Sequence, residues 1–449
     1  MAGLLGWVRR ALARAHLVEV AALLHHELGL GTEGLRALRL PVDLLVEFPR
    51  WRDGSTVGFS PRRLGLTPVP EAAGHPLRTL RLQLSSASGG TAVVLGLAHD
   101  LLHRLDPALR VVVLMDPETN ATDVRRLARE ALGRQRRLRL APVDFATIFA
   151  RDNALAARDA RGRPVLLVPR ALRTEWDSGS PPLGGSAARR LGVRVVRSRL
   201  YWHGGNVLFD GEALVIGADT VAENVARLGL SGDEVVRLLA AELGRDVVVL
   251  GSPARARFDA DGHRVTRSGQ ASYHIDLDVA LLGRPGDGPP VALVADPRRG
   301  LARLPAVLAH RSLALSPHLP PAHARRQIAR EFRAAARARE PLLREYRERL
   351  TRLGYRVVGV PELRTRSGRE AVLGVTSLDF VYCNVLPGLN RGRAAVHYLP
   401  WGIPALDAEA ERAFRDAGCR PVRVSRTAYL AHAMMQRAAG LRCFCGAMP

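Results

Sequence analysis

Lysine is absent from this 449-residue chain, so all 66 of its basic residues are arginines. This absence excludes chemistry that needs a lysine amine: a Schiff base, the lysine of a phosphate-binding loop, or an anchor for pyridoxal phosphate. An all-arginine composition first indicates a codon-biased genome. The formal net charge of +23 also allows an anionic partner. However, the arginines are scattered and not interleaved with aromatic residues, so we do not expect a nucleic-acid partner.

Cysteine is scarce as well. The chain has only four cysteines: Cys383, Cys419, Cys443 and Cys445. Their spacing matches no zinc finger, and their small number does not suggest the disulfide framework of a secreted protein. We therefore expect reduced thiols and a cytoplasmic location.

Long hydrophobic runs are missing too. No run approaches the roughly 20 apolar residues that span a membrane, although 47% of the residues are hydrophobic and can bury a core. Residues 1–17 are amphipathic and arginine-bearing. They are typical either of a targeting or membrane-surface segment or, as we favour, of an ordinary N-terminal helix.

The length allows two domains or one large composite domain. Residues 1–75 predict helices over 4–28 and 32–40, followed by proline-interrupted sequence to which we assign no chemistry. We expect an accessory N-terminal region over residues 1–75 and a catalytic domain over residues 76–449.

From residue 80 onward, short apolar runs alternate with helical patterns, which predicts an α/β fold. Strands are expected at 111–114, 138–140 and 291–295, and helices at 121–132 and 320–353. Three stretches share one order of hairpin, helix and strand, which indicates a repeated unit and not a doubly wound sheet. The three hairpins are expected at residues 144–168, 207–216 and 377–398.

Residues 271–278 predict a further strand. Alternate side chains of a strand share a face, so His274, Asp276 and Asp278 are expected to point the same way. A strand exposed to solvent on one face would show the same alternation. The Ser-, Pro- and Gly-rich stretch 176–185 is either a lid or a plain surface loop.

The C-terminal stretch 438–449 contains two cysteines, Cys443 and Cys445, beside Arg442 and behind a glycine. Positive charge and free backbone N–H groups lower the pKa of a thiol, so this setting is plausible for a nucleophile. Alternatively, both cysteines are apolar fillers of a C-terminal strand.

Four short motifs occur in order along the chain: Arg151-Asp152-Asn153, Gly204-Gly205-Asn206, His274-Ile275-Asp276 and Gly440-Leu441-Arg442-Cys443. Over residues 80–449 the chain resembles the guanidine-modifying enzymes of the pentein superfamily. These are arginine, agmatine and peptidyl-arginine deiminases, dimethylarginine hydrolases and glycine amidinotransferases. The Arg-Cys pair and the Met-Pro after it look most like the arginine deiminase tail. The resemblance implies a five-fold pseudosymmetric α/β propeller of ββαβ units with a central site, here preceded by an N-terminal helical extension.

By the same resemblance, Asp152 and Asp276 hold a planar guanidinium from opposite sides. Cys443 attacks the guanidino carbon and forms a thiouronium adduct, and His274 serves as general acid and then as general base. The resemblance implies no metal and no organic cofactor. The expected partner is a small-molecule or peptide guanidino substrate, and a homo-oligomer is left open.

The chain departs from many hydrolases of this family, which carry acids where it has His203 and Asn206. Peptidyl-arginine deiminases share a Gly-Asn corner like this one. His203 and Asn206 are expected in substrate binding, with a hydrogen-bonded corner as the alternative for His203. Arg151 either orients a substrate carboxylate or faces solvent. The spacing favours Cys443 over Cys445 as the nucleophile.

Three functions follow. The first is a cysteine-dependent deiminase that hydrolyses a C–N bond of a linear amidine in an arginine derivative or peptidyl arginine. The second is an amidinotransferase with an amine acceptor. The third is a non-catalytic, arginine-rich binding protein.

Overall fold

The computed structural model describes residues 65–84, 91–115, 126, 137–142, 148–170, 191–258, 265, 268–310, 321–365, 379–425 and 440–449. The helices expected over residues 4–28 and 32–40, and the stretch 176–185, lie outside these ranges. So does nearly all of the helix expected over residues 121–132.

The described strands form five sheets of three or four strands each. Every sheet contains an antiparallel pair of strands and a parallel pair of strands that have one strand in common. The three four-stranded sheets have the strand orders β1 (Thr67–Pro68), β5 (Leu155–Arg158), β6 (Pro164–Val168), β7 (Arg194–Arg197); β11 (Val279–Gly283), β12 (Val291–Asp296), β13 (Arg356–Arg364), β14 (Asp379–Val381); and β18 (Gly446–Ala447), β2 (Thr79–Leu84), β3 (Arg110–Met115), β4 (Leu138–Pro142). The two three-stranded sheets have the strand orders β10 (Val247–Leu250), β9 (Leu214–Gly217), β8 (Val207–Phe209); and β15 (Leu386–Asn390), β16 (Arg393–Tyr398), β17 (Arg420–Arg423).

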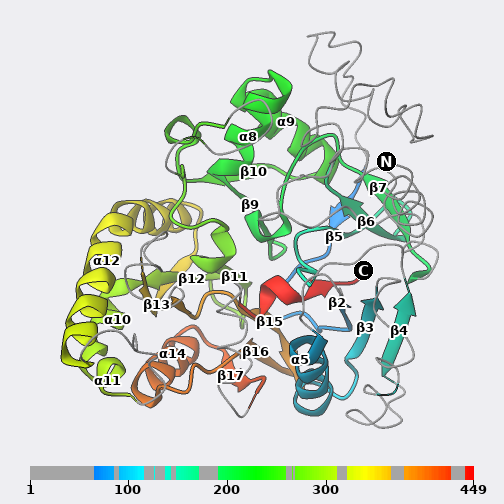
Figure 1. Ribbon diagram of the computed structural model, residues 1–449. Coiled ribbons are helices and arrows are strands. Elements are labelled where there is room, and N and C mark those ends of the chain that lie inside the picture. Colours follow the sequence, from blue (N-terminus) through cyan, green and yellow to red (C-terminus); the bar gives the residue numbers. More distant parts are fainter. Residues whose placement is uncertain are drawn as a thin grey trace, which may run out of the picture.

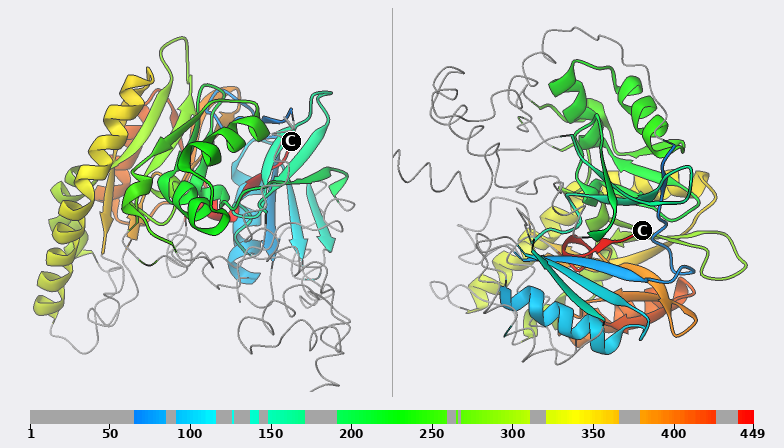
Figure 2. Two further views of the ribbon diagram at one scale, coloured as in Figure 1. Left: turned by 90° about the horizontal axis from the view of Figure 1, so that it is seen from above. Right: turned by 90° about the vertical axis from the view of Figure 1, so that its right-hand side faces the viewer.

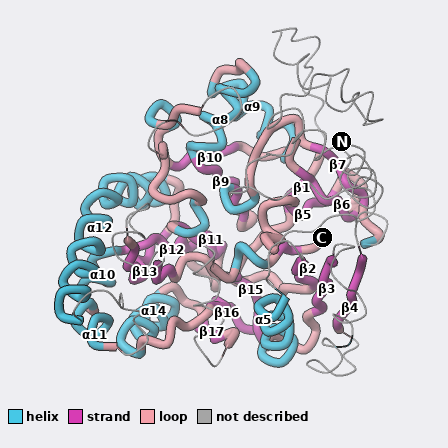
Figure 3. The backbone as a smooth tube through the Cα atoms, in the orientation of Figure 1, coloured by secondary structure: helices cyan, strands magenta, loops and turns pink. Residues whose placement is uncertain are grey.

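Described helices connect the parallel pairs β2–β3, β9–β10, β12–β13 and β16–β17, because parallel neighbours need a crossover connection. The described helices lie on the outer side of the strands that they connect (Figure 3). They are α5 (Thr91–Arg104), α8 (Ala218–Leu228), α9 (Gly232–Leu243), α10 (Pro297–Ala302), α11 (Leu304–Ala309), α12 (Pro321–Arg352) and α14 (Pro404–Asp416), with 3-10 turns η2 (Gly204–Asn206), η3 (Pro253–Arg255), η4 (Ile275–Leu277) and η5 (Arg442–Phe444).

The expected hairpin at residues 207–216 and the helix and strand after it are confirmed as β8, β9, α9 and β10. The ends of α9 follow from its sequence. Ser231 and Glu234 form a reciprocal capping box at the first turn, and Gly244 ends the helix in the left-handed conformation.

The third hairpin differs from the expectation. Residues 379–381 form β14, which pairs with β13 of the neighbouring sheet, and the hairpin partner of β16 is β15. Arg391 and Gly392 both have positive φ, so they form the tight two-residue connection that places β15 directly against β16.

The segment before β2 runs past the sheets one after another. Its residues 65–75, which the sequence assigns to an accessory region, hydrogen-bond to strands of four sheets before β2 begins the fifth. The backbone contacts are Val69 to Ala156 of β5, Glu71 to Phe209 of β8, Ala73 to Leu282 of β11, and Leu389 of β15 to His75.

The core is one large apolar cluster that reaches from Ala73 to Cys445 in sequence, with smaller clusters beside it. The 32-residue helix α12, expected over residues 320–353, buries a stripe at helical spacing against this core, including Ile328, Phe332 and Tyr346. The C-terminal segment lies near the middle of the molecule, between the sheets (Figures 1 and 2). Within the described ranges, no helix combines the length and hydropathy needed to cross a bilayer.

Candidate active site

Cys443 lies in the short turn η5, just before β18 joins β2 in an antiparallel pair. The residue is 5% exposed. The backbone carbonyl oxygen of Cys443 accepts a hydrogen bond from the backbone N–H of Arg151 at 3.1 Å. The ring of Phe444 packs on that of Phe149, with centroids 5.7 Å apart. The C-terminal strand thereby positions a thiol beside the Arg151 corner.

Asn384 holds this turn from the other side. Its Oδ1 accepts the backbone N–H groups of Arg442 at 2.7 Å and Cys443 at 3.3 Å, and its Nδ2 donates to the Cys443 Sγ at 3.4 Å. A Cβ on Gly440 would lie 2.6 Å from the Asn384 Oδ1. The glycine of the C-terminal motif is therefore needed for the approach of this carboxamide.

Gly204 and Gly205 lie where there is no room for a side chain. A Cβ on Gly204 would lie 2.0 Å from the Arg151 carbonyl oxygen, and one on Gly205 would lie 2.4 Å from the His274 Nδ1. The Gly205 N–H also donates to the Asp152 Oδ1 at 3.2 Å. Two residues without side chains thus allow the Arg-Asp corner and the histidine to meet.

His274 and Asp276 do not lie on a strand, contrary to the expectation for residues 271–278. Ile275–Leu277 form the 3-10 turn η4, and β11 begins only at Val279. The reason is the Asn206 carboxamide, whose Oδ1 accepts the Ile275 N–H at 3.0 Å and bends the chain toward the glycine corner. Gln270 donates to the same oxygen at 2.8 Å.

The turn buries His274 and Asp276 beside Asp152. His274 is 4% exposed and Asp276 is fully buried, and the His274 Nδ1 lies 3.8 Å from the Asp152 Oδ1. The rings of Tyr273 and His203 pack on His274, with centroids 4.3 Å and 5.3 Å away.

Asp278, expected on the same face, belongs to a different buried network. It accepts hydrogen bonds from Ser272 and Arg339, and Arg339 also pairs with Glu362. The single face expected for His274, Asp276 and Asp278 is therefore divided: Asp276 lies toward the corner and Asp278 toward α12.

Arg442 and Arg151 share one acid that the sequence does not single out. Arg442 donates through Nε to the Glu71 Oε2 at 3.0 Å and through Nη1 to the Asp276 Oδ2 at 2.9 Å. Arg151 pairs with the other oxygen of Glu71 and is 1% exposed, so it does not face solvent. With Asp152 adjacent and with Arg81 donating to the Ala150 carbonyl beside Arg151, three carboxylates face three buried guanidiniums, so the charges balance when all are ionised.

Several buried polar atoms at this place have no hydrogen-bond partner within the described residues. They include the His274 Nε2, the Asp276 Oδ1, and the Nε and Nη2 of Arg151. Buried polar groups are usually paired, so atoms of this kind are candidates for contacts to a ligand.

Burial raises the pKa of the Cys443 thiol well above its ordinary value, and the negative charges of Asp276 and Asp152 raise it further. The expectation that Arg442 would lower this pKa is wrong, because the Arg442 guanidinium is directed to Asp276 and Glu71. Burial also raises the pKa of Asp152, against the opposing effect of His274. Glu71 differs: burial opposes its ionisation, but Arg151 and Arg442 hold its pKa below the usual range.

Cys445 is also a free, fully buried thiol, and burial raises its pKa to about 12. Cys383 and Cys419 are free and buried as well. None of these three is held by Asn384 as Cys443 is.

Asp152, His203 and His274 each offer one atom capable of binding a metal, and these three atoms lie within 4.8 Å of one another. The His203 side chain is partly exposed and the other two are buried. The family resemblance places all three residues in one site but implies no metal there.

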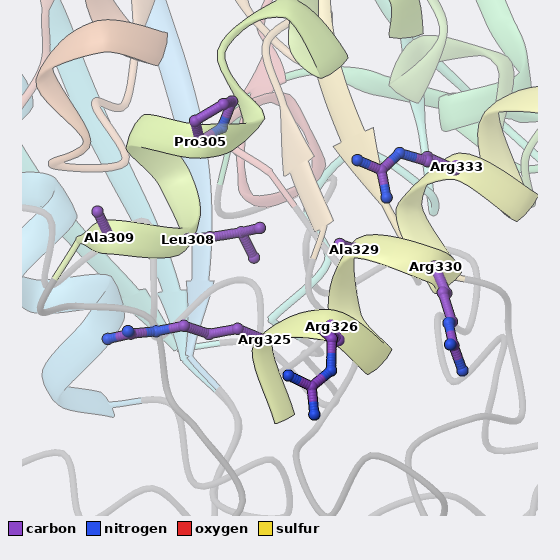
Figure 4. A pocket seen from close by; sticks show the side chains of 8 residues that line it. All are labelled: Pro305, Leu308, Ala309, Arg325, Arg326, Ala329, Arg330 and Arg333. Carbon is purple, nitrogen blue, oxygen red and sulfur yellow. The ribbon is translucent and has the colours of Figure 1, made fainter. Parts of the chain in front are cut away.

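An arginine-rich groove lies elsewhere, between α11 and α12 at the periphery of the fold (Figure 4). Its volume is about 550 Å³, and it is lined by Pro305, Leu308, Ala309, Arg325, Arg326, Ala329, Arg330 and Arg333. It shares no residue with the cluster around Cys443.

Glu71, Asn384 and Gln270 are the residues of the site that the sequence did not reveal. Each belongs to no motif. Their importance follows only from the contacts that bring positions 71, 206, 270, 384 and 442 together.

Solved structures provide the comparison. No protein-family model matches the sequence, and no curated protein matches it. The C. jejuni agmatine deiminase structure superposes with a TM-score of 0.51 at 12% identity, over 85% of this chain and 95% of that chain. A structural-genomics target assigned as an agmatine deiminase gives 0.52 at 12% identity, over 87% and 98%.

This chain has the agmatine deiminase fold. The mixed α/β architecture predicted from the sequence is thereby confirmed. At 12% identity the likeness concerns the fold alone, and the cluster around Cys443 must be interpreted from its own geometry.

Proposed function

We propose that this protein is a cysteine-dependent deiminase of the guanidine-modifying superfamily, with Cys443 as nucleophile. The observation that carries the proposal is a buried thiol beside two buried carboxylates and a histidine, with the His274 Nε2 and the Asp276 Oδ1 unpaired. The agmatine deiminase fold supports this assignment. The five-fold propeller arrangement is part of the proposal, supported by five sheets of one strand pattern and by the segment that visits them in turn.

The carboxylates supply the binding energy for a cation. A guanidinium that donates to Asp152 on one side and to the Asp276 Oδ1 on the other would meet a carboxylate at each end. Asp276 is pre-oriented by Arg442, and Asp152 by the Gly205 N–H. Such fixed partners keep the guanidino carbon near the thiol.

The substrate cation also activates the nucleophile. Without it, burial and the two carboxylates keep Cys443 protonated. A guanidinium between those carboxylates cancels their effect on the thiol pKa, and the Asn384 Nδ2 and the Gly440 N–H stabilise the thiolate.

The reaction then proceeds in two halves. The Cys443 thiol gives its proton to His274 as the Sγ bonds to the guanidino carbon, and His274 passes that proton to the departing nitrogen, so the C–N bond breaks, ammonia leaves and a thiouronium adduct remains. His274 next removes a proton from water, which attacks the same carbon. The C–S bond breaks, and a ureido product and the free thiol result.

The corner residues take supporting roles in this proposal. Asn206 positions His274 and Asp276 through its bond to the Ile275 N–H. Arg151 is proposed to hold Glu71 and the Cys443 backbone in place. His203 is proposed to border the bound guanidinium through its packing on His274.

We propose an alkylguanidine without a carboxylate as the preferred substrate, and agmatine is the first compound to test. Near the thiol, the guanidiniums of Arg442 and Arg151 are both held by Glu71. Arg442 is also engaged by Asp276, and the three acids of the cluster would repel a carboxylate. The Arg151 Nε and Nη2, which are unpaired, are the donors that would bind a carboxylate if one were accepted, so arginine is the comparison substrate.

The test is ammonia release from agmatine, arginine and a peptidyl arginine by wild type and Cys443→Ser. Turnover of agmatine in preference to the others, lost in Cys443→Ser, supports the proposal. Ammonia release that survives in Cys443→Ser excludes the mechanism. Transfer of the amidino group to added glycine, in place of hydrolysis, would instead identify an amidinotransferase.

A further inference from the structure

We propose that Asp152, His203 and His274 form a binding site for a divalent transition-metal ion, for which Zn²⁺ is the probe. We further infer that the bound metal blocks guanidine binding. The second statement rests on the proposed deiminase function, whereas the first stands on the side chains alone.

The donor set fits such an ion. Two imidazoles and one carboxylate are typical ligands of zinc and other first-row metals, at bond lengths of about 2.0–2.2 Å. The three donor atoms already lie within 4.8 Å of one another. Tetrahedral ligands at those bond lengths are about 3.5 Å apart, so small side-chain movements bring all three to one ion.

The surroundings of the donors are those of a supported site. The Gly205 N–H fixes the Asp152 Oδ1, and Tyr273 packs on both imidazoles, with centroids 4.3 Å from His274 and 6.0 Å from His203. Partners of this kind orient metal ligands and strengthen binding. The Asp276 Oδ1, which is buried and unpaired, also presents negative charge close to the donors.

The overlap with the proposed reaction is direct. Asp152 would bind either the metal or the guanidinium, and His274 could not transfer a proton while its ring nitrogen holds the metal. A metal cation here would also repel the substrate cation. His203 stands where many hydrolases of the family carry an acid, and it adds an imidazole to the ligand set. The bound metal would thus inhibit the chain.

The experiment uses the full chain with His99→Asn and His103→Asn. These remove an exposed pair of stacked imidazoles on α5, which is another place among the described residues where zinc could bind. Zinc binding is measured by calorimetry, and Co²⁺ binding by its visible absorption. We expect one tight site that weakens at least about 10-fold in His203→Asn and in Asp152→Asn.

Absence of a tight site, or affinity unchanged in His203→Asn, would overturn the metal site. So would a thiolate-to-cobalt charge-transfer band that persists in His203→Asn, because it would place the metal on Cys443. None of these measurements needs turnover, so they are independent of the deiminase proposal.

The blocking is tested with a haloacetamidine, a guanidinium mimic that alkylates a nearby thiol. Zinc should protect Cys443 from labelling in the chain that keeps His203 and not in His203→Asn, and EDTA should restore labelling. If zinc binds with full labelling, the overlap is wrong although the metal site stands. If Cys443 is never labelled, even without metal, the deiminase proposal fails while the binding measurements remain valid.

Discussion

Arg442 donates a hydrogen bond to Glu71 at 3.0 Å although 371 positions separate the two residues in sequence. The contact joins the segment before β2 to the C-terminal turn that carries Cys443. Because Glu71 also pairs with Arg151, one carboxylate bridges the two arginines Arg151 and Arg442.

Replacing Glu71 with Gln should destabilise the protein strongly. Two buried guanidiniums would lose their shared partner, and breaking a buried pair typically costs about 3–5 kcal/mol. Thermal unfolding of Glu71→Gln measures this loss. The control is Glu212→Gln, whose pair with Arg284 is about half exposed and should change stability by less than about 1 kcal/mol. Equal shifts in the two variants would contradict the role assigned to Glu71.

The two C-terminal cysteines should behave differently. Cys443→Ser should lower kcat by at least about 10³-fold, because the nucleophile is lost. Cys445→Ser should retain most of the activity, because that thiol lies behind the turn. Ammonia release by both folded variants is the measurement, and comparable losses would move the nucleophile assignment away from Cys443.

Asn384 should affect the reaction rate by stabilising the Cys443 thiolate. Asn384→Ala removes the donor to Sγ and both acceptor contacts to the turn, and we expect kcat to fall about 100-fold. Asn384→Asp keeps the acceptor but adds negative charge near Sγ, so it should move the rising limb of the pH–rate profile, on which Cys443 ionises, to higher pH. A purely structural role would lower stability and leave that limb in place.

The glycine corner offers a matched pair of variants. A Cβ at Gly205 would lie 2.4 Å from the His274 Nδ1, whereas one at Gly286 would meet nothing within 4 Å. Gly205→Ala should displace His274 and cost about 100-fold in kcat/KM, while Gly286→Ala should be neutral. Full activity in Gly205→Ala would show that His274 need not stay where it lies.

The pH dependence follows from two raised pKa values. Cys443 in the free enzyme should react with iodoacetamide slowly near neutral pH, with a rate still rising above the ordinary thiol pKa of 9.0. Asp152 must be ionised to bind a cation, so kcat/KM should fall as the pH drops through a value above the ordinary 3.8. Fast labelling at pH 7 without substrate would contradict the first statement. A limb below 3.8 would contradict the second.

The sequence was sufficient where local rules decide the structure. The α9 helix follows from Ser231, Glu234 and Gly244, and the β8–β9 hairpin from alternating apolar residues around a turn. The motif residues at 152, 205, 274 and 443 were also found in one place, since each occupies a chain corner.

Tertiary contacts decided the rest. A period-two pattern at residues 274–278 indicated a strand, but the Asn206 carboxamide holds that stretch in a turn. Arg442 was expected to act on the thiol, yet its charge is taken up by Glu71 and Asp276. Ion pairs between distant positions leave no mark in a single sequence.

The pairing of β18 with β2 has a consequence for biosynthesis. A ribosome releases Cys443 only after the residues of the other four sheets have been made, and the thiol meets Glu71, Asp152 and Asp276 only when β18 docks on β2. Contacts of such long sequence separation form slowly. Labelling of Cys443 by a guanidinium mimic would therefore report the completion of folding, and partly folded chains would carry an inert nucleophile.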